Sequence, residues 1–259
     1  MSDPPKVASD SWRCRWVCPP PEPLGDEDAR SLLSVVSRAA SIAESVRAVD
    51  CVGLEIRAAY YLESGQPAQT SLNDNDYWDK KCRALFLRPA IEPALISYWD
   101  RVTSLDLDEV KAQKMVSAIT AKEQVFRRGE STGRSIYGSV GFESLDRAHD
   151  WLKRLKEAQR QPEFASFMPM YTFATVIMSH PFGDGNGRLA RAMTQASLGN
   201  LAGWRFPILA LAPSFYRRAE TLGRTLDELT IQGNWRPYIK VFVEILADAI
   251  DLTRRSLAL

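Results

Sequence analysis

The sequence predicts a mostly α-helical protein with one small β-hairpin. Apolar residues recur at three- and four-residue steps along most of the chain, which is the spacing of amphipathic helices. Only residues 124–140 show two short β-branched or aromatic runs joined by a turn with two glycines, the pattern of a hairpin. The length of 259 residues allows one large domain or two small ones, with a sizeable core.

Residues 1–26 contain six of the 15 prolines, which predicts a Pro-rich, poorly ordered lead. A helical N-terminal region of unknown function is expected over residues 27–119. Its first helix starts at Asp26, and two further helices are predicted over 85–98 and 106–120.

The second half of the chain begins with the hairpin and continues with helices. Apolar positions keep helical spacing in five stretches, namely 144–160, 167–179, 187–198, 214–229 and 239–252. Pro181 disfavours helical geometry for the residue before it, so one helix should end at His180. Gly199 and Asn200 should end the next helix, and residues 253–259 form a tail.

The charge balance excludes several classes of function. The chain has 33 Lys and Arg against 32 Asp and Glu, and this net charge of +1 argues against a nucleic-acid-coating or polybasic membrane-surface protein. No apolar run reaches the length of about 18 residues that spans a bilayer, and the first residues lack the apolar stretch of a cleaved signal peptide. We therefore expect no nucleic acid, no membrane, and a location in the bacterial cytoplasm or, after delivery, in a host cell.

Histidine and cysteine usage limits metal chemistry. With only two histidines, His149 and His180, the chain cannot build a metal site from several imidazoles. The cysteines lack the two close pairs of structural zinc sites, so we expect free thiols in a reducing compartment. They are Cys14, Cys18, Cys51 and Cys82.

The most informative segment is the loop between the helix that ends at His180 and the helix that begins near Gly187. Its three closely spaced glycines allow backbone amides to approach a ligand, and consecutive amides in such a turn bind anions. The positive end of the following helix strengthens this effect. Arg188 and Arg191 lie three residues apart on that helix, and guanidinium groups bind phosphate oxygens. The pattern predicts a polyphosphate site.

Two further side chains add chemistry to this site. Asp184 supplies a carboxylate oxygen, and Mg²⁺ bound to phosphates typically takes one or two such ligands. His180 lies at the entrance of the loop, where an imidazole can remove a proton near neutral pH. Together these groups indicate phosphoryl or nucleotidyl transfer. The chain has neither a Walker A sequence nor a dinucleotide-binding glycine pattern.

The run His-Pro-Phe-Gly-Asp-Gly-Asn-Gly-Arg-Leu-Ala-Arg over residues 180–191 resembles the signature of Fic-domain proteins, His-x-Phe-x-Asp/Glu-Gly-Asn-Gly-Arg-x-x-Arg. Taken singly, the histidine would be an ordinary helix cap and the arginines a solvated helix face, but every defining position matches jointly. The resemblance implies a Fic-type helical bundle with a β-hairpin flap, preceded by the helical N-terminal region. We assign residues 120–252 to the Fic core.

This resemblance implies a protein adenylyltransferase that transfers AMP from ATP and Mg²⁺ to a Ser, Thr or Tyr hydroxyl of a target protein. By position, His180 looks like the base, Asp184 the Mg²⁺ ligand and Phe182 the anchor of the loop. The remaining motif residues look like an anion hole for the α- and β-phosphates and two clamps on the distal phosphates. They are Gly185, Asn186 and Gly187 for the anion hole, and Arg188 and Arg191 for the clamps.

Several alternatives stay open. Relatives that transfer phosphate carry a lysine at the position of Gly187, which this chain lacks, but some relatives accept UMP, GMP or phosphocholine donors. A non-catalytic nucleotide-binding module is a further alternative. The hairpin arginines are either target-docking residues or ordinary exposed strand charges; they are Arg127, Arg128 and Arg134.

Many Fic proteins carry an inhibitory helix of the form Ser/Thr-x-x-x-Glu-Gly/Asn. The stretch 41–44 has the wrong spacing, and the stretch 139–144 has the spacing but ends in serine. Inhibition, where it exists, is therefore expected from a separate antitoxin-like protein or from an unrecognised element in residues 27–120.

Overall fold

The computed structural model describes residues 25–43, 107–120, 122–129, 142, 144–202, 209 and 211–256. These residues are mostly helical, which confirms the predicted fold class. The elements are α1 (Asp26–Ala43), α5 (Glu109–Thr120), α6 (Leu145–His149), α7 (Trp151–Gln159), the 3₁₀ helix η2 (Pro162–Phe167), α8 (Met168–Ser179), α9 (Asn186–Ala202), α10 (Leu211–Arg217), α11 (Ala219–Gln232) and α12 (Trp235–Ser256).

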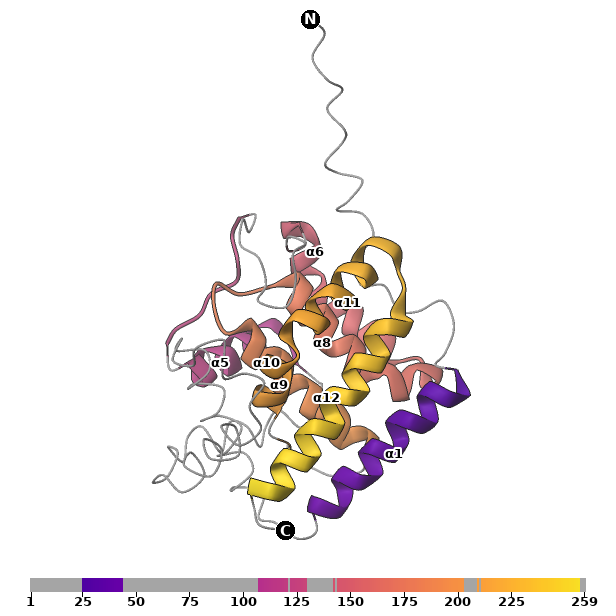
Figure 1. The fold of residues 1–259 in the computed structure, drawn as a ribbon. Helices are drawn as coiled ribbons and strands as arrows, with labels where there is room; N and C mark the ends of the chain where they lie inside the picture. The colour runs from indigo at the N-terminus through magenta and orange to yellow at the C-terminus, as the bar shows by residue number, and fades with distance from the viewer. Residues whose placement is uncertain are drawn as a thin grey trace, which may run out of the picture.

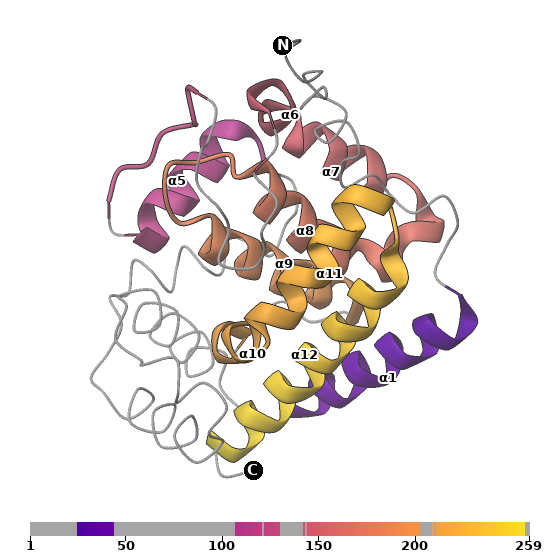
Figure 2. The same ribbon diagram turned by 45° about the horizontal axis from the view of Figure 1, so that its top comes forward.

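Helix α8 forms the centre of the bundle. All of its residues are buried, as expected for a helix that is apolar on every side. It packs against α9 and α7, and Figures 1 and 2 show α8 and α9 in the middle of the helices. The hydroxyl of Tyr238 on α12 donates to the main-chain oxygen of Met170 at 2.9 Å, which joins α12 to this centre.

Helices α1 and α12 lie side by side at the edge of the bundle (Figures 1 and 2). Leu32 of α1 is fully buried and belongs to the same hydrophobic core as the residues of α8. Arg38 of α1 also pairs with Asp251 of α12 at 2.9 Å. The first helix of the predicted N-terminal region thus shares a core with residues 120–252, while a boundary near residue 120 stays a prediction.

Several helix boundaries differ from the prediction. The stretch 144–160 is interrupted at Asp150, whose N–H bonds to the oxygen of Arg147 three residues earlier and closes α6 with a tighter turn. The stretch 214–229 is interrupted at Arg218. Gly199 does not end α9, because it is buried inside the helix and the helix continues to Ala202. By contrast, α8 ends at Ser179 as predicted.

Only the first arm of the predicted hairpin falls within the described residues. There, Phe126 forms an isolated antiparallel bridge with Phe182, which belongs to the loop after α8. The second arm, the helix predicted over 85–98 and all four cysteines lie outside the described residues.

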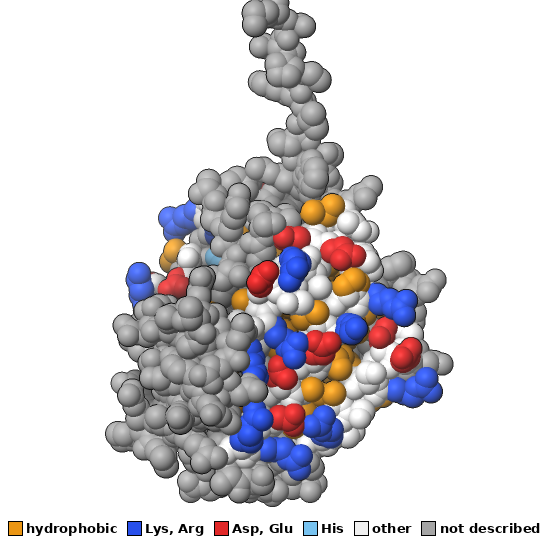
Figure 3. All heavy atoms as spheres, viewed as in Figure 1, with side chains coloured by type: hydrophobic (Ala, Val, Ile, Leu, Met, Phe, Trp, Pro, Cys, Tyr) orange, Lys and Arg blue, Asp and Glu red, His pale blue; other side chains and the backbone are white. Residues whose placement is uncertain are grey.

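The face that carries α1, α11 and α12 shows basic and acidic side chains interspersed over its described part (Figure 3). Among the described helices, none combines the length and apolar character needed to cross a bilayer.

Candidate functional site

A left-handed turn at His180 ends α8 and starts the loop. His180 has φ 45° and ψ 57°, and it is the only non-glycine residue with positive φ in the described part of the chain. Its N–H donates to the oxygen of Val176 at 3.1 Å, which closes the last turn of the helix. Pro181 prevents the helix from continuing, so the chain turns away at this point.

The imidazole of His180 lies in a confined environment. Its ring stacks on the ring of Phe142, with centroids 3.8 Å apart and planes inclined by 21°. Burial and, secondly, the charge of Arg127 lower the pKa of His180 to about 4, although the charge of Asp184 partly opposes them. The ring is therefore uncharged at neutral pH and able to accept a proton.

The loop is anchored at Phe182, as the motif resemblance implies. The side-chain oxygen of Asn186 accepts from the N–H of Phe182 at 3.0 Å, and its amide nitrogen donates to the Phe182 oxygen at 2.8 Å. The Phe182 ring is fully buried and lies 4.6 Å from the ring of Phe126. The Asn186 side chain thus holds the loop. The main-chain N–H of Asn186 belongs to the first turn of α9, where N–H groups have no acceptor within the helix.

Of the glycines in the loop, Gly185 is the one whose backbone conformation favours glycine. Its φ is +80°, and an added Cβ would lie 2.5 Å from Thr120 Cγ2 and 2.8 Å from Val116 Cγ2 on α5. At Gly183 an added Cβ would meet no atom within 4 Å. Helix α5 therefore packs directly against Gly185 and so supports the start of α9.

Asp184 and Arg188 meet at the start of α9. Arg188 Nη2 lies 3.6 Å from Asp184 Oδ1, which also accepts from the N–H of Gly185 at 2.6 Å. The Asp184 side chain is 64% exposed and that of Arg188 is 12% exposed. In the described part of the chain, no group of three or more His, Cys, Asp or Glu residues could hold a metal.

Arg191 faces a different environment from the other motif residues. Its side chain is fully buried, and its Cζ lies 5.9 Å from the ring centroid of Tyr216 on α10. The structure thus brings the motif from His180 to Arg188 together around the loop, and it places the Arg191 side chain between α9 and α10.

The extended segment 124–128 runs beside the loop, and its two arginines differ. The N–H of Arg127 donates to the oxygen of Pro181 at 2.8 Å, and its Nη2 donates to the oxygen of Ser179 at 3.2 Å. The Arg127 side chain is only 9% exposed, whereas Arg128 is exposed and Arg134 lies outside the described residues. Arg127 therefore points into the molecule, and Arg128 is the exposed one of the two.

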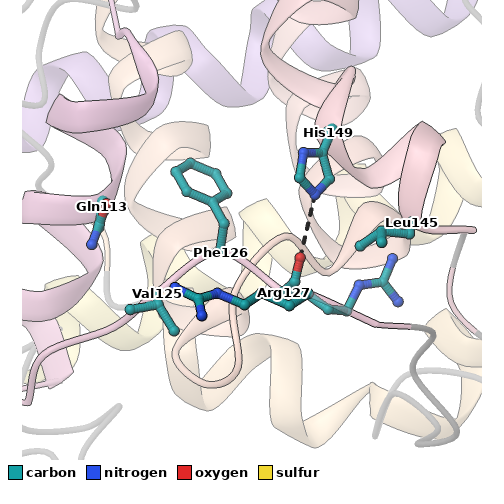
Figure 4. A pocket seen from close by; sticks show the side chains of 7 residues that line it. Gln113, Val125, Phe126, Arg127, Leu145 and His149 are labelled. Atoms are coloured by element: carbon teal, nitrogen blue, oxygen red, sulfur yellow. Dashed lines mark hydrogen bonds between the residues drawn. The ribbon is translucent and has the colours of Figure 1, made fainter.

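A pocket of about 440 Å³ lies between α5, this segment and α6. Figure 4 shows His149 pointing from α6 toward the main-chain oxygen of Arg127, with the Phe126 ring to one side. The Nε2 of His149 lies 3.3 Å from the main-chain oxygen of Arg127, which can only accept, so this contact requires a proton on Nε2.

Sequence reasoning missed Phe142, the inward direction of Arg127 and the contact of α5 with Gly185. Phe142 stands alone in the sequence without a pattern around it. For Arg127, the nearest signal was the predicted strand, in which neighbouring residues such as Arg127 and Arg128 point to opposite faces.

No protein-family model matches the sequence, and no curated protein matches it. Solved structures do match the fold. A Fic family protein from Desulfovibrio desulfuricans G20 superimposes with a TM-score of 0.62 at 15% identity, covering 90% of this chain and 75% of that one. Fic-1 from C. elegans superimposes with a TM-score of 0.56 at 14% identity, covering 90% and 73%. The chain has the Fic fold.

Proposed function

We propose that this protein transfers AMP from ATP to a Ser, Thr or Tyr hydroxyl of a target protein. The observation that carries the proposal is the run 180–191. It matches the Fic signature, and on a Fic fold it forms a helix end, a tight loop and a helix start. Two solved structures with this fold are described as Fic proteins, which supports the same type of chemistry here.

His180 would act as the general base. The target hydroxyl gives its proton to the imidazole while its oxygen attacks the α-phosphorus of ATP, and the bond from that phosphorus to the bridging oxygen breaks, so pyrophosphate leaves. The lowered pKa of His180 keeps the ring in the form that accepts a proton. Because the histidine ends α8, a buried helix fixes its position.

The first turn of α9 would hold the phosphates. Its main-chain N–H groups, from Asn186 to Arg188, have no acceptor within the helix and lie at the positive end of its dipole. The guanidinium of Arg188 adds a charge-assisted donor beside them. Binding of distal phosphates by Arg191 requires its buried side chain to become accessible to the nucleotide.

Mg²⁺ would neutralise phosphate charge in this reaction, and Asp184 is the residue that would hold it. The donor set fits, because an exposed carboxylate beside a phosphate-binding helix start is a site of the kind that Mg²⁺ shares with nucleotides. The partners of the protein would be a target with a hydroxyl side chain and, unless an element in residues 27–120 supplies inhibition, a separate antitoxin-like inhibitor.

The test is a donor screen by intact mass spectrometry. The protein is incubated with Mg²⁺ and ATP, GTP, UTP or CTP, alone and with a cell lysate, in parallel with H180N. Asparagine is chosen because it tolerates left-handed backbone geometry and so keeps the turn. We expect a mass gain of one AMP, on the protein itself or on a lysate protein, that requires both ATP and His180.

A gain with another nucleotide only would replace AMP by that group within the same reaction. If no donor gives an adduct on the chain or on any lysate protein, the transferase proposal is wrong. An adduct that persists in folded H180N would remove His180 from its role as the base.

A further inference from the structure

Arg127 bonds to the chain on both sides of His180. Its side chain donates to the oxygen of Ser179, the residue before the histidine, at 3.2 Å. Its main-chain N–H donates to the oxygen of Pro181, the residue after the histidine, at 2.8 Å. One residue from a distant segment therefore holds the two carbonyl groups that flank the left-handed turn.

The turn needs such support. A non-glycine residue with positive φ is strained, and such geometry persists only where the surrounding structure holds it. Ser179 also lies at the carboxyl end of α8, where the last carbonyls lack donors within the helix and the dipole attracts a cation. Arg154 also binds at the carboxyl end of α8, because its Nη2 donates to Ser179 Oγ at 2.6 Å.

Arg127 is itself fixed in place. Its Nη2 also donates to the oxygen of Ser144 at 3.4 Å, and its own main-chain oxygen accepts from His149 Nε2 at 3.3 Å (Figure 4). With 9% exposure, the side chain has little room to move away from the turn. The position of His180 is thereby joined to α6 and to the segment 124–128.

We propose that Arg127 is a positioning residue for His180, which fixes the left-handed turn and so presents the imidazole to the target hydroxyl without contacting the substrate itself. This inference rests on the proposed function, in which His180 is the base. It adds a residue outside the signature on which the geometry of the reacting histidine depends.

The test compares R127Q and R127K with R160Q, in which an exposed arginine at the end of α7 is removed. The rate is measured with ATP and the acceptor found in the donor screen. We expect R127Q to lower kcat by about 10²-fold, as a misplaced reacting group does, with the KM for ATP within about twofold of wild type. R127K keeps the charge but loses the planar guanidinium, so its kcat should fall less. R160Q should match the wild type.

A second readout does not depend on activity. The chain has two histidines, so NMR spectra contain two sets of ring signals, and H180N identifies which set belongs to His180. The His180 signals should shift in folded R127Q and also in folded R127K, which keeps the positive charge that acts on the ring, and they should stay in place in R160Q. If folded R127Q keeps the wild-type signal and kcat, the inference is wrong.

Further outcomes separate the two proposals. If R127Q does not fold, the same two measurements on R127K test the inference. A kcat and His180 signals in R127K equal to those of the wild type would contradict it. An equal loss in R160Q would show a general charge effect and would also contradict it. If the wild type is inactive with every donor, the proposed function fails, while the His180 signals in R127K still test the positioning.

Discussion

At His180, burial and the charge of Arg127 favour the neutral ring, so folding and protonation oppose each other at this residue. The ordinary pKa of 6.5 applies in the unfolded chain and a pKa of about 4 in the folded one. Between these values the unfolded state binds a proton that the folded state does not. The contribution of His180 to stability is therefore complete above about pH 6.5 and lost as the pH falls toward 4.

We predict that acidification from pH 7 to pH 4.5 destabilises the wild type more than H180N. The difference should be on the order of 3 kcal/mol or less, from the pKa change of His180. Urea unfolding at several pH values measures it, and comparing the two proteins removes the common contribution of the carboxylates. Equal pH dependence in both proteins would show that the pKa of His180 is not lowered in this way.

The two motif arginines should differ when they are removed. R188A should weaken ATP binding by about 1.5–3 kcal/mol, the worth of a charge-assisted contact, with a smaller loss of stability than R191A, because the Arg188 side chain is 12% exposed. R191A should weaken ATP binding similarly and also lower stability, because Arg191 is fully buried against Tyr216. Calorimetric titration with ATP and Mg²⁺, together with urea unfolding, separates these effects. Unchanged ATP affinity would remove the mutated arginine from the site.

At the level of elements, the contact between α5 and the loop gives a prediction at Gly185. G185A should cost about 1–3 kcal/mol in backbone strain, with a further cost from the close approach to Thr120 and Val116. G183A is the matched control, because an added Cβ there meets no atom within 4 Å. Urea unfolding measures both. A G185A protein as stable as G183A would mean that α5 does not support the loop at this point.

Local signals predicted the end of α8 and the loop, and distant contacts were not predicted. Pro181 and the helical spacing before it determine where α8 ends, and both can be recognised within a few residues of sequence. The stacking of Phe142 on His180 and the pairing of Phe126 with Phe182 join residues 38 and 56 positions apart, so no local pattern reports them. The burial of Arg191 was missed because helical spacing alone does not show which neighbour covers a side chain.

At the level of the whole molecule, α1 should unfold together with residues 120–252. L32A removes a fully buried side chain from the shared core and should cost about 2–5 kcal/mol. R38A removes an ion pair whose side chains are 46% and 51% exposed, and it should cost less than about 1 kcal/mol. Thermal unfolding should remain a single transition in both. Two separate transitions in L32A would make α1 part of an independent domain.

The complete burial of α8 also affects the fraction of molecules in which His180 is in position. Amides in a helix enclosed on all sides exchange with solvent only when the whole protein opens, so α8 should be among the slowest-exchanging segments of the chain. His180 directly follows this helix, and Arg127 bonds to the carbonyl groups on both sides of it, so we expect its main chain to stay in place in the folded state. Nearly every folded molecule therefore carries the histidine in place before any ligand arrives, and ligand binding does not have to pay for ordering it.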